Sequence, residues 1–464
     1  MFDFLFHPNS IALVGITISN PEHWTRNYLN ALIEMDFKGQ IFLVNRNGGE
    51  IEGRKVYQSL AEIPGKVDYV ISTVPASAAP DLIKDCAVKG VKVVHLCTSG
   101  FSETGEEEGI RLETEVSKLA RKTGIRIIGP NCLGIYCPKS HLSFEPGFPQ
   151  ENGAVGFISQ SGGNTVMLIK HLASWRGVRF SKVISIGNAC DLNETDFLEY
   201  LTDDPDTKII AMYIEGIKDG IRFKKVLGKA TKVKPVILYK GGVTKGGARA
   251  TLGHTGSLAG NETTWNSLCR QFGVIQVNSL EELADVLVTL LFFPLPRGRS
   301  TVVIGGAGGA SVTISDLLEK NGLDVPALPQ EIKADIRSFV TVAGNSLRNP
   351  IDIGQIILEV DKVVETANIV TRWEGTDFLT TFFHPGAFPP TVIPLFIRMI
   401  DGIHRVSTLN SKPVAYIILS SIIPEVAAHA YAYFTRTASL SVPVYYSFEG
   451  AARAIDLVLR YNKI

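Results

Sequence analysis

The 464-residue chain lacks an excess of charge of either sign. Its 46 lysines and arginines balance its 46 aspartates and glutamates. Without a net positive field, the chain has no general attraction for nucleic acid or for an anionic membrane, so we expect neither as a partner. Hydrophobic residues make up 45% of the chain and charged residues 20%, which is typical of a soluble globular protein.

Cysteine pairs and long hydrophobic runs are also absent. The six cysteines are scattered and form no C-x-x-C pair, so neither a zinc site nor a disulfide framework is indicated. The longest apolar run, near 286–294, ends at a proline and is too short to cross a bilayer. The N-terminus has no basic segment followed by an apolar stretch, as a signal peptide would have. These absences predict a reduced, cytoplasmic protein with no structural metal.

Short runs rich in valine and isoleucine alternate with helix-like segments along the chain. Where both faces of a parallel sheet are covered by helices, strands have this continuous apolar character. The pattern resumes after two proline-rich stretches, 145–149 and 294–298, which are candidate linkers. The sequence therefore predicts an α/β protein of three Rossmann-like or flavodoxin-like domains, at residues 1–150, 151–298 and 299–464.

Two common nucleotide-binding signatures are missing from these domains. There is no G-x-x-x-x-G-K-[ST] loop, and the strand–glycine–helix junctions near Gly15, Ser159 and Gly305 contain no intact G-x-G-x-x-G. The second strand ends in Val44-Asn45 and not in an acidic residue, which argues against an NAD-dependent oxidoreductase. Ligands of doubly wound sheets bind at the carboxyl ends of strands, so we expect a site among those loops.

A glycine-rich run surrounds one histidine, from Lys240 to Gly260 (KGGVTKGGARATLGHTGSLAG). So many glycines cost backbone entropy, and the run therefore predicts a loop with unusual backbone angles or close approach by a ligand. A neutral imidazole at His254 could attack an electrophile such as a phosphoryl group. The alternative is that His254 is only a polar residue of a turn.

Two further segments could complete a phosphoryl-transfer site. Ser159-Gln160-Ser161-Gly162-Gly163 precedes a predicted helix over 164–175, where free N–H groups and the helix dipole favour a phosphate. A plain helix cap is the alternative. Glu215 ends another apolar strand and could accept the Nδ1–H of His254, which would leave Nε2 as the nucleophile. The alternative is a solvated glutamate at a strand end.

Asn188 and Asp191 follow the strand that precedes the one ending at Glu215. Their position at the carboxyl end of a predicted strand would let them line the same pocket. Both residue types also form Asx turns, so a purely local role is the alternative.

The order of these motifs resembles the α subunit of the NDP-forming acyl-CoA synthetases, which include ADP-forming acetate–CoA ligases and the succinyl-CoA synthetase α chain. The resemblance covers nearly the whole chain. No single motif is decisive, but eight in this order are highly specific. The matching segments are Val44–Glu50, Ser99–Phe101, Gly129–Gly134, Ile158–Gly162, Gly187-Asn188 with Asp191, Glu215-Gly216, Gly253–Gly256 and Asn349–Asp352.

The resemblance implies a CoA-binding domain followed by two succinyl-CoA-synthetase-like domains. In this family, acyl-CoA and phosphate give an acyl phosphate, and a histidine then carries the phosphoryl group to ADP. Carried over, His254 is the phosphohistidine and Glu215 orients it. The implied phosphate-binding residues are Ser159, Gln160, Ser161, Gly162, Gly163 and Asn188, and the implied CoA-binding residues are Gly15, Asn45, Val74, Pro75, Ser99 and Asn131.

The family's ADP/ATP and Mg²⁺ bind at an ATP-grasp module, and none follows the third predicted domain. The resemblance therefore implies a separate ATP-grasp β subunit, in an α2β2 heterotetramer acting on a small carboxylic acid. One loop departs from the family pattern: Ile16 and Thr17 replace small residues, and Thr25 stands where glycine is common. This departure is the main support for the alternative function, a non-catalytic regulatory subunit that binds CoA or acyl-CoA.

Overall fold

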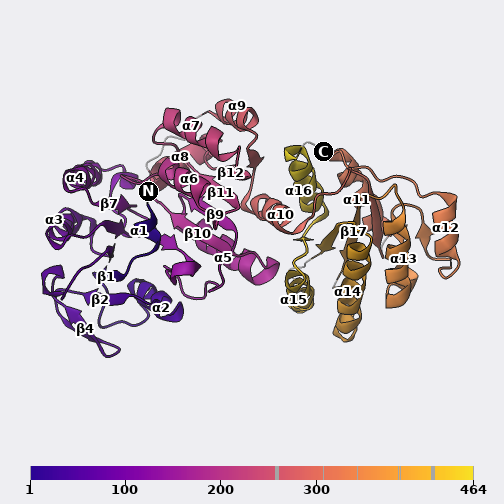
Figure 1. Ribbon diagram of the computed structural model, residues 1–464, viewed down its shortest axis with the longest axis horizontal. Coiled ribbons are helices and arrows are strands. Elements are labelled where there is room, and N and C mark those ends of the chain that lie inside the picture. Colours follow the sequence, from indigo (N-terminus) through magenta and orange to yellow (C-terminus); the bar gives the residue numbers. More distant parts are fainter. Residues whose placement is uncertain are drawn as a thin grey trace. The chain divides into compact units, whose positions relative to one another are not determined.

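The computed structural model describes residues 2–255, 261–306, 308–341, 343–384, 386, 388–419 and 424–462 (Figure 1). The chain divides into two compact units. We call Met1–Lys170 with Arg179–Asn278 the N-terminal unit, and His171–Val178 with Ser279–Ile464 the C-terminal unit. The described residues form three mainly parallel sheets flanked by helices, so the predicted α/β class is confirmed.

The first sheet has the strand order β3-β4-β2-β1-β5-β6-β7, and only β3 and β4 pair antiparallel. Its strands are β1 (Ser10–Val14), β2 (Gln40–Val44), β3 (Gly49–Ile51), β4 (Arg54–Tyr57), β5 (Tyr69–Ser72), β6 (Val93–Leu96) and β7 (Arg126–Ile128). Its helices are α1 (Asp3–Phe6), α2 (Asn27–Glu34), α3 (Ala79–Lys89) and α4 (Glu107–Thr123), with short 3-10 helices η1 (Trp24–Arg26), η2 (Leu60–Glu62), η3 (Ala76–Ala78) and η4 (Ser102–Thr104).

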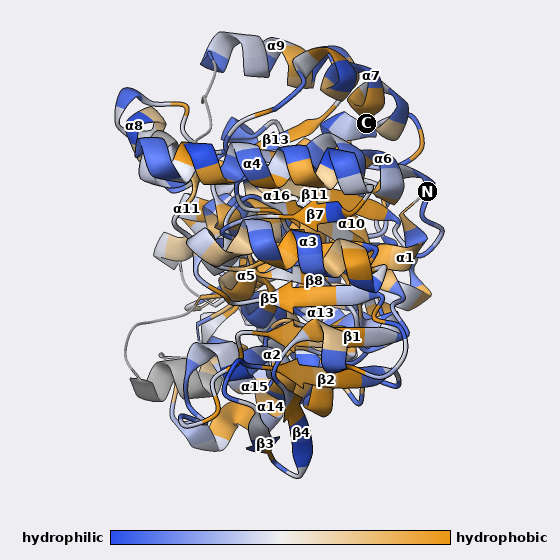
Figure 2. Ribbon diagram, turned by 90° about the vertical axis from the view of Figure 1, so that its left-hand side faces the viewer, coloured by the Kyte–Doolittle hydropathy of each residue, from blue (hydrophilic) through white to orange (hydrophobic). Residues whose placement is uncertain are grey.

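Helices on both faces explain why the first-sheet strands are continuously apolar. All five residues of β1 are buried, and Ala12 and Val14 share a core cluster with Leu82 of α3 and Val116 of α4. Figure 1 shows α3 and α4 on one side of this sheet and α2 on the other. In Figure 2 the strands β1, β2 and β5 are mainly hydrophobic, whereas polar residues recur along α4. The carboxyl-end loops of the sheet are therefore held by a rigid three-layer frame.

The second sheet has the order β13-β12-β11-β9-β10-β8, in which β8 runs antiparallel to β10. Its strands are β8 (Gly134–Tyr136), β9 (Val155–Ser159), β10 (Phe180–Ser185), β11 (Ile209–Ile214), β12 (Val236–Lys240) and β13 (Ile275–Val277). The flanking helices are α5 (Gly162–Arg176), α6 (Glu194–Asp203), α7 (Gly220–Ala230), α8 (Lys245–Thr255) and α9 (Glu262–Phe272), and η5 (Pro138–Ser140) follows β8.

The proline-rich stretch 145–149 is packed against this second sheet. Phe148 is buried, and its ring lies 5.0 Å from that of Tyr136 in β8. Tyr136 also donates a hydrogen bond from its hydroxyl to the carbonyl of Pro149 at 2.5 Å. The stretch is therefore an ordered connection fixed to the strand that precedes it, and not a free linker.

The C-terminal unit contains the third sheet, with the order β15-β16-β14-β17-β18-β19. Its strands are β14 (Thr301–Gly305), β15 (Ser346–Leu347), β16 (Ile351–Asp352), β17 (Phe378–Phe383), β18 (Val414–Ile418) and β19 (Val444–Tyr445). Its helices are α10 (Leu280–Phe292), α11 (Gly308–Lys320), α12 (Gln330–Arg337), α13 (Val360–Arg372), α14 (Ile393–Leu409), α15 (Pro424–Ser439) and α16 (Phe448–Tyr461), with η6 (Gly354–Ile356) and η8 (Pro390–Val392).

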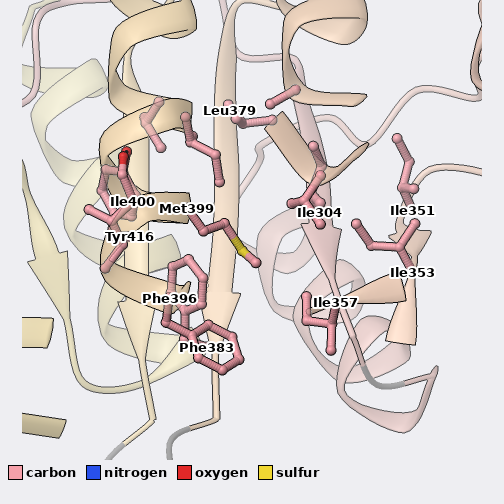
Figure 3. Packing of buried hydrophobic residues seen from close by; sticks show 14 of the residues in the cluster. Ile304, Ile351, Ile353, Ile357, Leu379, Phe383, Phe396, Met399, Ile400 and Tyr416 are labelled. Atoms are coloured by element: carbon pink, nitrogen blue, oxygen red, sulfur yellow. The ribbon is translucent and has the colours of Figure 1, made fainter. Parts of the chain in front are cut away.

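Aliphatic and aromatic side chains from strands and helices fill one core of the C-terminal unit. Figure 3 shows Ile304 and Leu379 of the sheet in the same cluster as Phe396 and Met399 of α14. Phe383, at the end of β17, lies 5.8 Å from Phe396 in an edge-on arrangement. Such aromatic pairs add specific geometry to the burial of apolar surface.

One local prediction is wrong: residues 245–255 of the glycine-rich run form helix α8 and not a loop. Thr244 caps this helix, because its hydroxyl accepts a hydrogen bond from the N–H of Gly247 at 3.1 Å. Ala248, Arg249 and Ala250 are good helix formers, and α8 lies against η4, which offsets the cost of the helix's glycines. Residues 241–244 are irregular, as predicted, and residues 256–260 lie outside the described residues. Among the described helices, none is both long and apolar enough to traverse a bilayer.

Candidate active site

His254, in the last turn of α8, lies against Glu215, directly after β11. Its Nδ1 atom is 2.9 Å from Oε1 and 3.1 Å from Oε2 of that carboxylate. The Glu215 side chain is 4% exposed, whereas that of His254 is 49% exposed. The hydrogen bond with Glu215 raises the pKa of His254 above its ordinary value. Because a carboxylate only accepts, Nδ1 is the donor in this contact, and a neutral ring would then carry its lone pair on Nε2. The structure therefore brings the two predicted catalytic residues into contact.

Three buried polar side chains hold Glu215 in place. Gln160 accepts hydrogen bonds at Oε1 from the N–H groups of Glu215 and Gly216. Tyr213 donates to Oε1 of Glu215 at 3.0 Å. Lys240 donates from Nζ to the backbone carbonyl of Glu215 at 2.8 Å. Hydrogen bonds to both the backbone and the side chain of Glu215 thus fix the orientation of its carboxylate.

Sequence reasoning missed Tyr213 and Lys240. Burial lowers the pKa of Lys240 to about 8, and its ammonium lies 5.4 Å from the ring centre of Trp265. Tyr213 stands two residues before Glu215, which places both on one face of the chain as it leaves β11. A lysine ending the apolar strand β12 was the other available signal, since a buried lysine needs partners.

Residues 159–163, which the sequence predicts to bind phosphate, lie at the start of α5. Their serine hydroxyls already form hydrogen bonds within this turn. Ser159 donates from Oγ to the carbonyl of Ser161 at 2.9 Å and accepts from the N–H of Ser161 at 3.2 Å. Ser161 Oγ accepts from the N–H of Asn164 at 3.4 Å and thereby caps the helix. These serines shape the turn, so any anion bound here would be held mainly by backbone N–H groups and the helix dipole.

Gly162, Gly163 and Gln160 determine the space and the hydrogen-bond donors that an anion would find at this turn. A Cβ at Gly163 would meet no atom within 4 Å, whereas a Cβ at Gly162 would meet the Leu133 side chain at 2.9 Å. Glycine at 162 therefore allows close packing, and Gly163 faces open space. Gln160 is 1% exposed, and its Nε2 atom has no hydrogen-bond partner among the described residues. A buried amide donor without a partner is costly, so it is suited to an anionic ligand.

Asn188 and Asp191 lie near the site with their side chains occupied. Asn188 is fully buried, and its Nδ2 donates to Glu103 at 2.6 Å and to Glu113 at 2.8 Å. Both amide hydrogens are thereby used, so Asn188 has none left for a phosphate. Asp191 accepts two hydrogen bonds from Arg126, at 2.9 and 3.2 Å, and forms a local ion pair.

A cleft of about 770 Å³ lies at the carboxyl ends of β1, β2 and β5. Four of the six predicted CoA-binding residues line it: Gly15, Asn45, Val74 and Pro75. Ser99 is exposed and does not line the cleft, and Asn131 donates from Nδ2 to the carbonyl of His254 at 3.2 Å. The lining also includes residues that sequence reasoning did not select, among them Arg46, Asn47, Gln58 and Thr73.

The first loop of the cleft requires its glycine. Gly15 has a φ of +90°, and a Cβ there would lie 2.9 Å from both Thr73 Oγ1 and the N–H nitrogen of Val74. The residues that depart from the family pattern point elsewhere: Ile16 and Thr25 are buried, and Thr25 Oγ1 accepts from the N–H of Thr17 at 3.2 Å. The unusual residues therefore stabilise the loop from within and leave the cleft unobstructed. The residues present fit a CoA group.

The described part of the chain holds no group of three or more His, Cys, Asp and Glu side chains arranged to bind a metal ion. The site itself brings together an oriented imidazole, a helix N-terminus and a neighbouring cleft.

Three protein-family models match the chain in order. The CoA binding domain matches residues 9–138, the succinyl-CoA ligase like flavodoxin domain matches 152–290, and the ligase-CoA domain matches 301–440. A dinucleotide-forming acetyl-coenzyme A synthetase 1 of Ca. Korarchaeum cryptofilum, solved with phosphate and ADP, is structurally similar with a TM-score of 0.82. It is 30% identical, and the match covers 100% of this chain and 97% of that chain.

Two relatives come from Pyrococcus furiosus. The α subunit of its ADP-forming acetate–CoA ligase I is 38% identical over 358 residues, 75% of this chain and 76% of the relative. The α subunit of ligase II is 35% identical over 434 residues, 92% of both chains. On this similarity and the matching domain order, the chain belongs to the family of α subunits of ADP-forming acetate–CoA ligases.

Proposed function

We propose that this chain transfers a phosphoryl group through His254 in an ADP-forming acyl-CoA synthetase reaction. The observation that carries the proposal is the contact of His254 Nδ1 with both oxygens of buried Glu215, at 2.9 and 3.1 Å, on a half-exposed imidazole. The overall reaction converts acyl-CoA, phosphate and ADP to a carboxylic acid, CoA and ATP. Dividing it into two phosphoryl steps is what covalent catalysis supplies.

The first step joins the acyl group to phosphate. The cleft at Gly15, Asn45, Val74 and Pro75, with Ser99 at its neighbouring loop, is proposed to hold CoA. A phosphate oxygen attacks the thioester carbonyl carbon, the C–S bond breaks, and the CoA thiol leaves with a proton. Backbone N–H groups of Gly162 and Gly163, with the buried Nε2 of Gln160, would neutralise the phosphate charge.

In the second step Nε2 of His254 attacks the phosphorus atom of the acyl phosphate. The bond between phosphorus and the acyl oxygen breaks, and the carboxylate leaves. The imidazole gains positive charge as the N–P bond forms, and the carboxylate of Glu215 stabilises that charge through Nδ1–H. ADP later takes the phosphoryl group, which restores neutral His254.

The name "subunit alpha" carried by the Pyrococcus relatives supports a partner subunit. We propose that this partner is an ATP-grasp β subunit that binds ADP or ATP with Mg²⁺, in an α2β2 assembly, and that a small carboxylic acid is the substrate. The domains at 1–150, 151–298 and 299–464 would bind CoA, carry His254 and complete the ligase, respectively. All six cysteines are free thiols, which supports a reducing cytoplasmic location. Nothing observed favours the regulatory alternative, because Ile16 and Thr25 are buried away from the cleft.

The test is phosphorylation of the chain co-expressed with an ATP-grasp partner, using γ-labelled ATP and Mg²⁺. We expect an acid-labile, base-stable label that His254→Ala abolishes and that CoA plus a carboxylic acid discharges. His404→Ala, at a partly buried histidine on α14, is the matched control and should keep the label. Absence of label with a partner shown to be competent on another α subunit would contradict the proposal.

A further inference from the structure

A buried amide joins two carboxylates beside the active site. Nδ2 of Asn188 donates to Oε2 of Glu103 at 2.6 Å and to Oε2 of Glu113 at 2.8 Å. Two carboxylates that converge on one nitrogen repel each other, and the two amide hydrogens counter that repulsion. The orientation of the Asn188 amide is therefore fixed: Nδ2 faces the carboxylates, and Oδ1 faces away from them.

The carboxylate side of this cluster holds the loop after β6. Oε1 of Glu103 accepts from the N–H groups of Gly100 at 2.6 Å and Phe101 at 3.1 Å. Glu113 of α4 accepts from the N–H and the hydroxyl of Ser102, at 3.2 and 2.6 Å. This loop, residues 98–102, includes Ser99, a proposed CoA-binding residue. A ligand that orders the loop would thereby also fix both carboxylates.

The amide oxygen of Asn188 contacts Asn131, which in turn bonds His254 in the last turn of α8. Nδ2 of Asn131 lies 3.4 Å from Oδ1 of Asn188 and donates to the backbone carbonyl of His254 at 3.2 Å. The backbone carries the same connection, since Asn131 donates its N–H to Thr98 and Asn188 donates its N–H to Pro130. α8 itself lies against η4, which contains Glu103. A continuous set of hydrogen bonds therefore runs from the loop at 98–102 to His254.

We infer that Asn131 and Asn188 are positioning residues that couple CoA binding to the docking of His254 at Glu215. The inference rests on the proposed function, because it takes the loop at 98–102 as part of the CoA site. CoA orders the loop, and the loop holds Glu103. Glu103 then fixes the orientation of the Asn188 side-chain amide. Asn188 then orients Asn131, which holds the carbonyl of His254. Linkage makes the coupling reciprocal: docked His254 should favour bound CoA to the same degree.

Such coupling would serve the chemistry of the site. His254 has to meet the acyl phosphate where CoA is bound, and it must then give its phosphoryl group to a nucleotide. A histidine segment held more firmly when CoA is present favours the first of these steps while CoA occupies the cleft. The strength expected of a single neutral hydrogen bond corresponds to about a fivefold change in the docking equilibrium.

Asn131 is the best position to test. Its φ of 57° is tolerated by asparagine and glycine, so Asn131→Gly keeps the backbone conformation and removes only the side chain. Asn131→Asp keeps the size and removes the donor. A matched control is Asn345→Gly in the C-terminal unit, where Nδ2 likewise donates to a backbone carbonyl, that of Thr341, at 2.9 Å.

The experiment is hydrogen–deuterium exchange of the full chain with and without saturating CoA. In the wild type and in Asn345→Gly, CoA should slow exchange in the loop at 98–102 and, by about fivefold, in α8. In Asn131→Gly and Asn131→Asp, CoA should still slow exchange in the loop, but the effect on α8 should be lost. A merely structural role for Asn131 would alter α8 equally with and without CoA.

Three results would overturn the inference. Equal CoA protection of α8 in the wild type and in both Asn131 variants would mean that the hydrogen bonds do not transmit the effect. Protection of the loop without protection of α8 in the wild type would remove the coupling and leave the proposed function standing. No CoA protection of the loop in any protein would instead contradict CoA binding there, and with it the proposed function.

Discussion

The carboxylate of Glu215 contacts Nδ1 of His254, so in the proposed reaction Nε2 is the nucleophile. We predict that Glu215→Gln lowers the maximal rate of His254 phosphorylation by roughly a hundredfold, because the tautomer and the developing positive charge lose their partner. Only neutral imidazole attacks phosphorus, so the rate should rise with pH through the pKa of His254. The hydrogen bond to Glu215 raises that pKa. Removing this hydrogen bond should therefore lower the pKa of His254 and move the midpoint of the pH–rate profile to lower pH.

The measurement is the rate of single-turnover phosphorylation by labelled acetyl phosphate, followed against pH for wild type and variant. Tyr213→Phe is a graded control, since it removes one hydrogen bond to the same carboxylate at 3.0 Å and keeps the charge. It should reduce the rate far less and leave the midpoint near that of the wild type. A Glu215→Gln midpoint at or above the wild-type value would refute the role given to this carboxylate.

At the scale of elements, the sequence predicts best where one physical cause dominates. Burial on both faces makes β1 and β11 continuously apolar, so the sequence predicts where both strands end, near Gly15 and at Glu215. α8 was missed because its stability depends on packing against η4, a contact distant in sequence. The hairpin of β3 and β4 was missed because its exposed residues carry no apolar pattern.

The residues of the candidate site also differ in how far the sequence predicts them. His254 and Glu215 belong to recognisable segments, and the structure brings them within hydrogen-bond distance. The roles of Lys240 and Asn188 come from hydrogen bonds between segments distant in sequence, and such bonds leave no local pattern. Tyr213 bonds Glu215 only two residues along the chain. The motifs therefore predict that His254 and Glu215 act together, and the structure adds Tyr213 and Lys240 as residues that hold Glu215.

The loop after β1 carries the second prediction. Gly15→Ala adds a Cβ 2.9 Å from Thr73 Oγ1 and Val74 N, so the loops that line the cleft at these residues must shift. We expect affinity for CoA to fall by roughly tenfold, or about 1.4 kcal/mol, as measured by titration calorimetry. Gly53→Ala, in the turn between β3 and β4, also has positive φ, +74°, but meets no atom within 4 Å.

Both alanine variants should lose about 1 kcal/mol of stability from the left-handed backbone. Only the variant at Gly15 should bind CoA more weakly. Equal CoA affinities for the two variants would show that the loop after β1 does not contribute to the CoA site.

At the scale of the whole molecule, residues 171–178 belong with the C-terminal unit although they precede the third predicted domain by more than a hundred residues. Trp175 packs at 5.3 Å from the ring of Phe434, and Arg176 lies 4.0 Å from the ring of Tyr446. Arg176 also forms a buried ion pair with Asp285 of α10 at 2.5 Å. The end of α5 is therefore part of the core of the C-terminal unit, which a linear division of the sequence does not predict.

The ion pair of Arg176 with Asp285 gives a prediction that distinguishes the stability of one unit from that of the other. Burial raises the pKa of Asp285 even though Arg176 is beside it, so desolvation of the carboxylate outweighs the attraction of its partner. Arg176→Met leaves this carboxylate buried and unpaired, and should destabilise the C-terminal unit by about 3–5 kcal/mol. Arg176→Met with Asp285→Leu removes both charges and should restore most of that stability.

Hydrogen exchange under native conditions measures the opening of each segment separately. In Arg176→Met, protection of α10 and α16 should fall, while β9 and β11 in the N-terminal unit keep theirs, because no buried charge is left unpaired there. The buried pair of Lys182 with Asp204 provides the reverse case: Lys182→Met should weaken β9 and β10 and spare α16. A uniform loss across both units in either variant would mean that the chain unfolds as one cooperative body, whereas selective losses would give each unit its own stability.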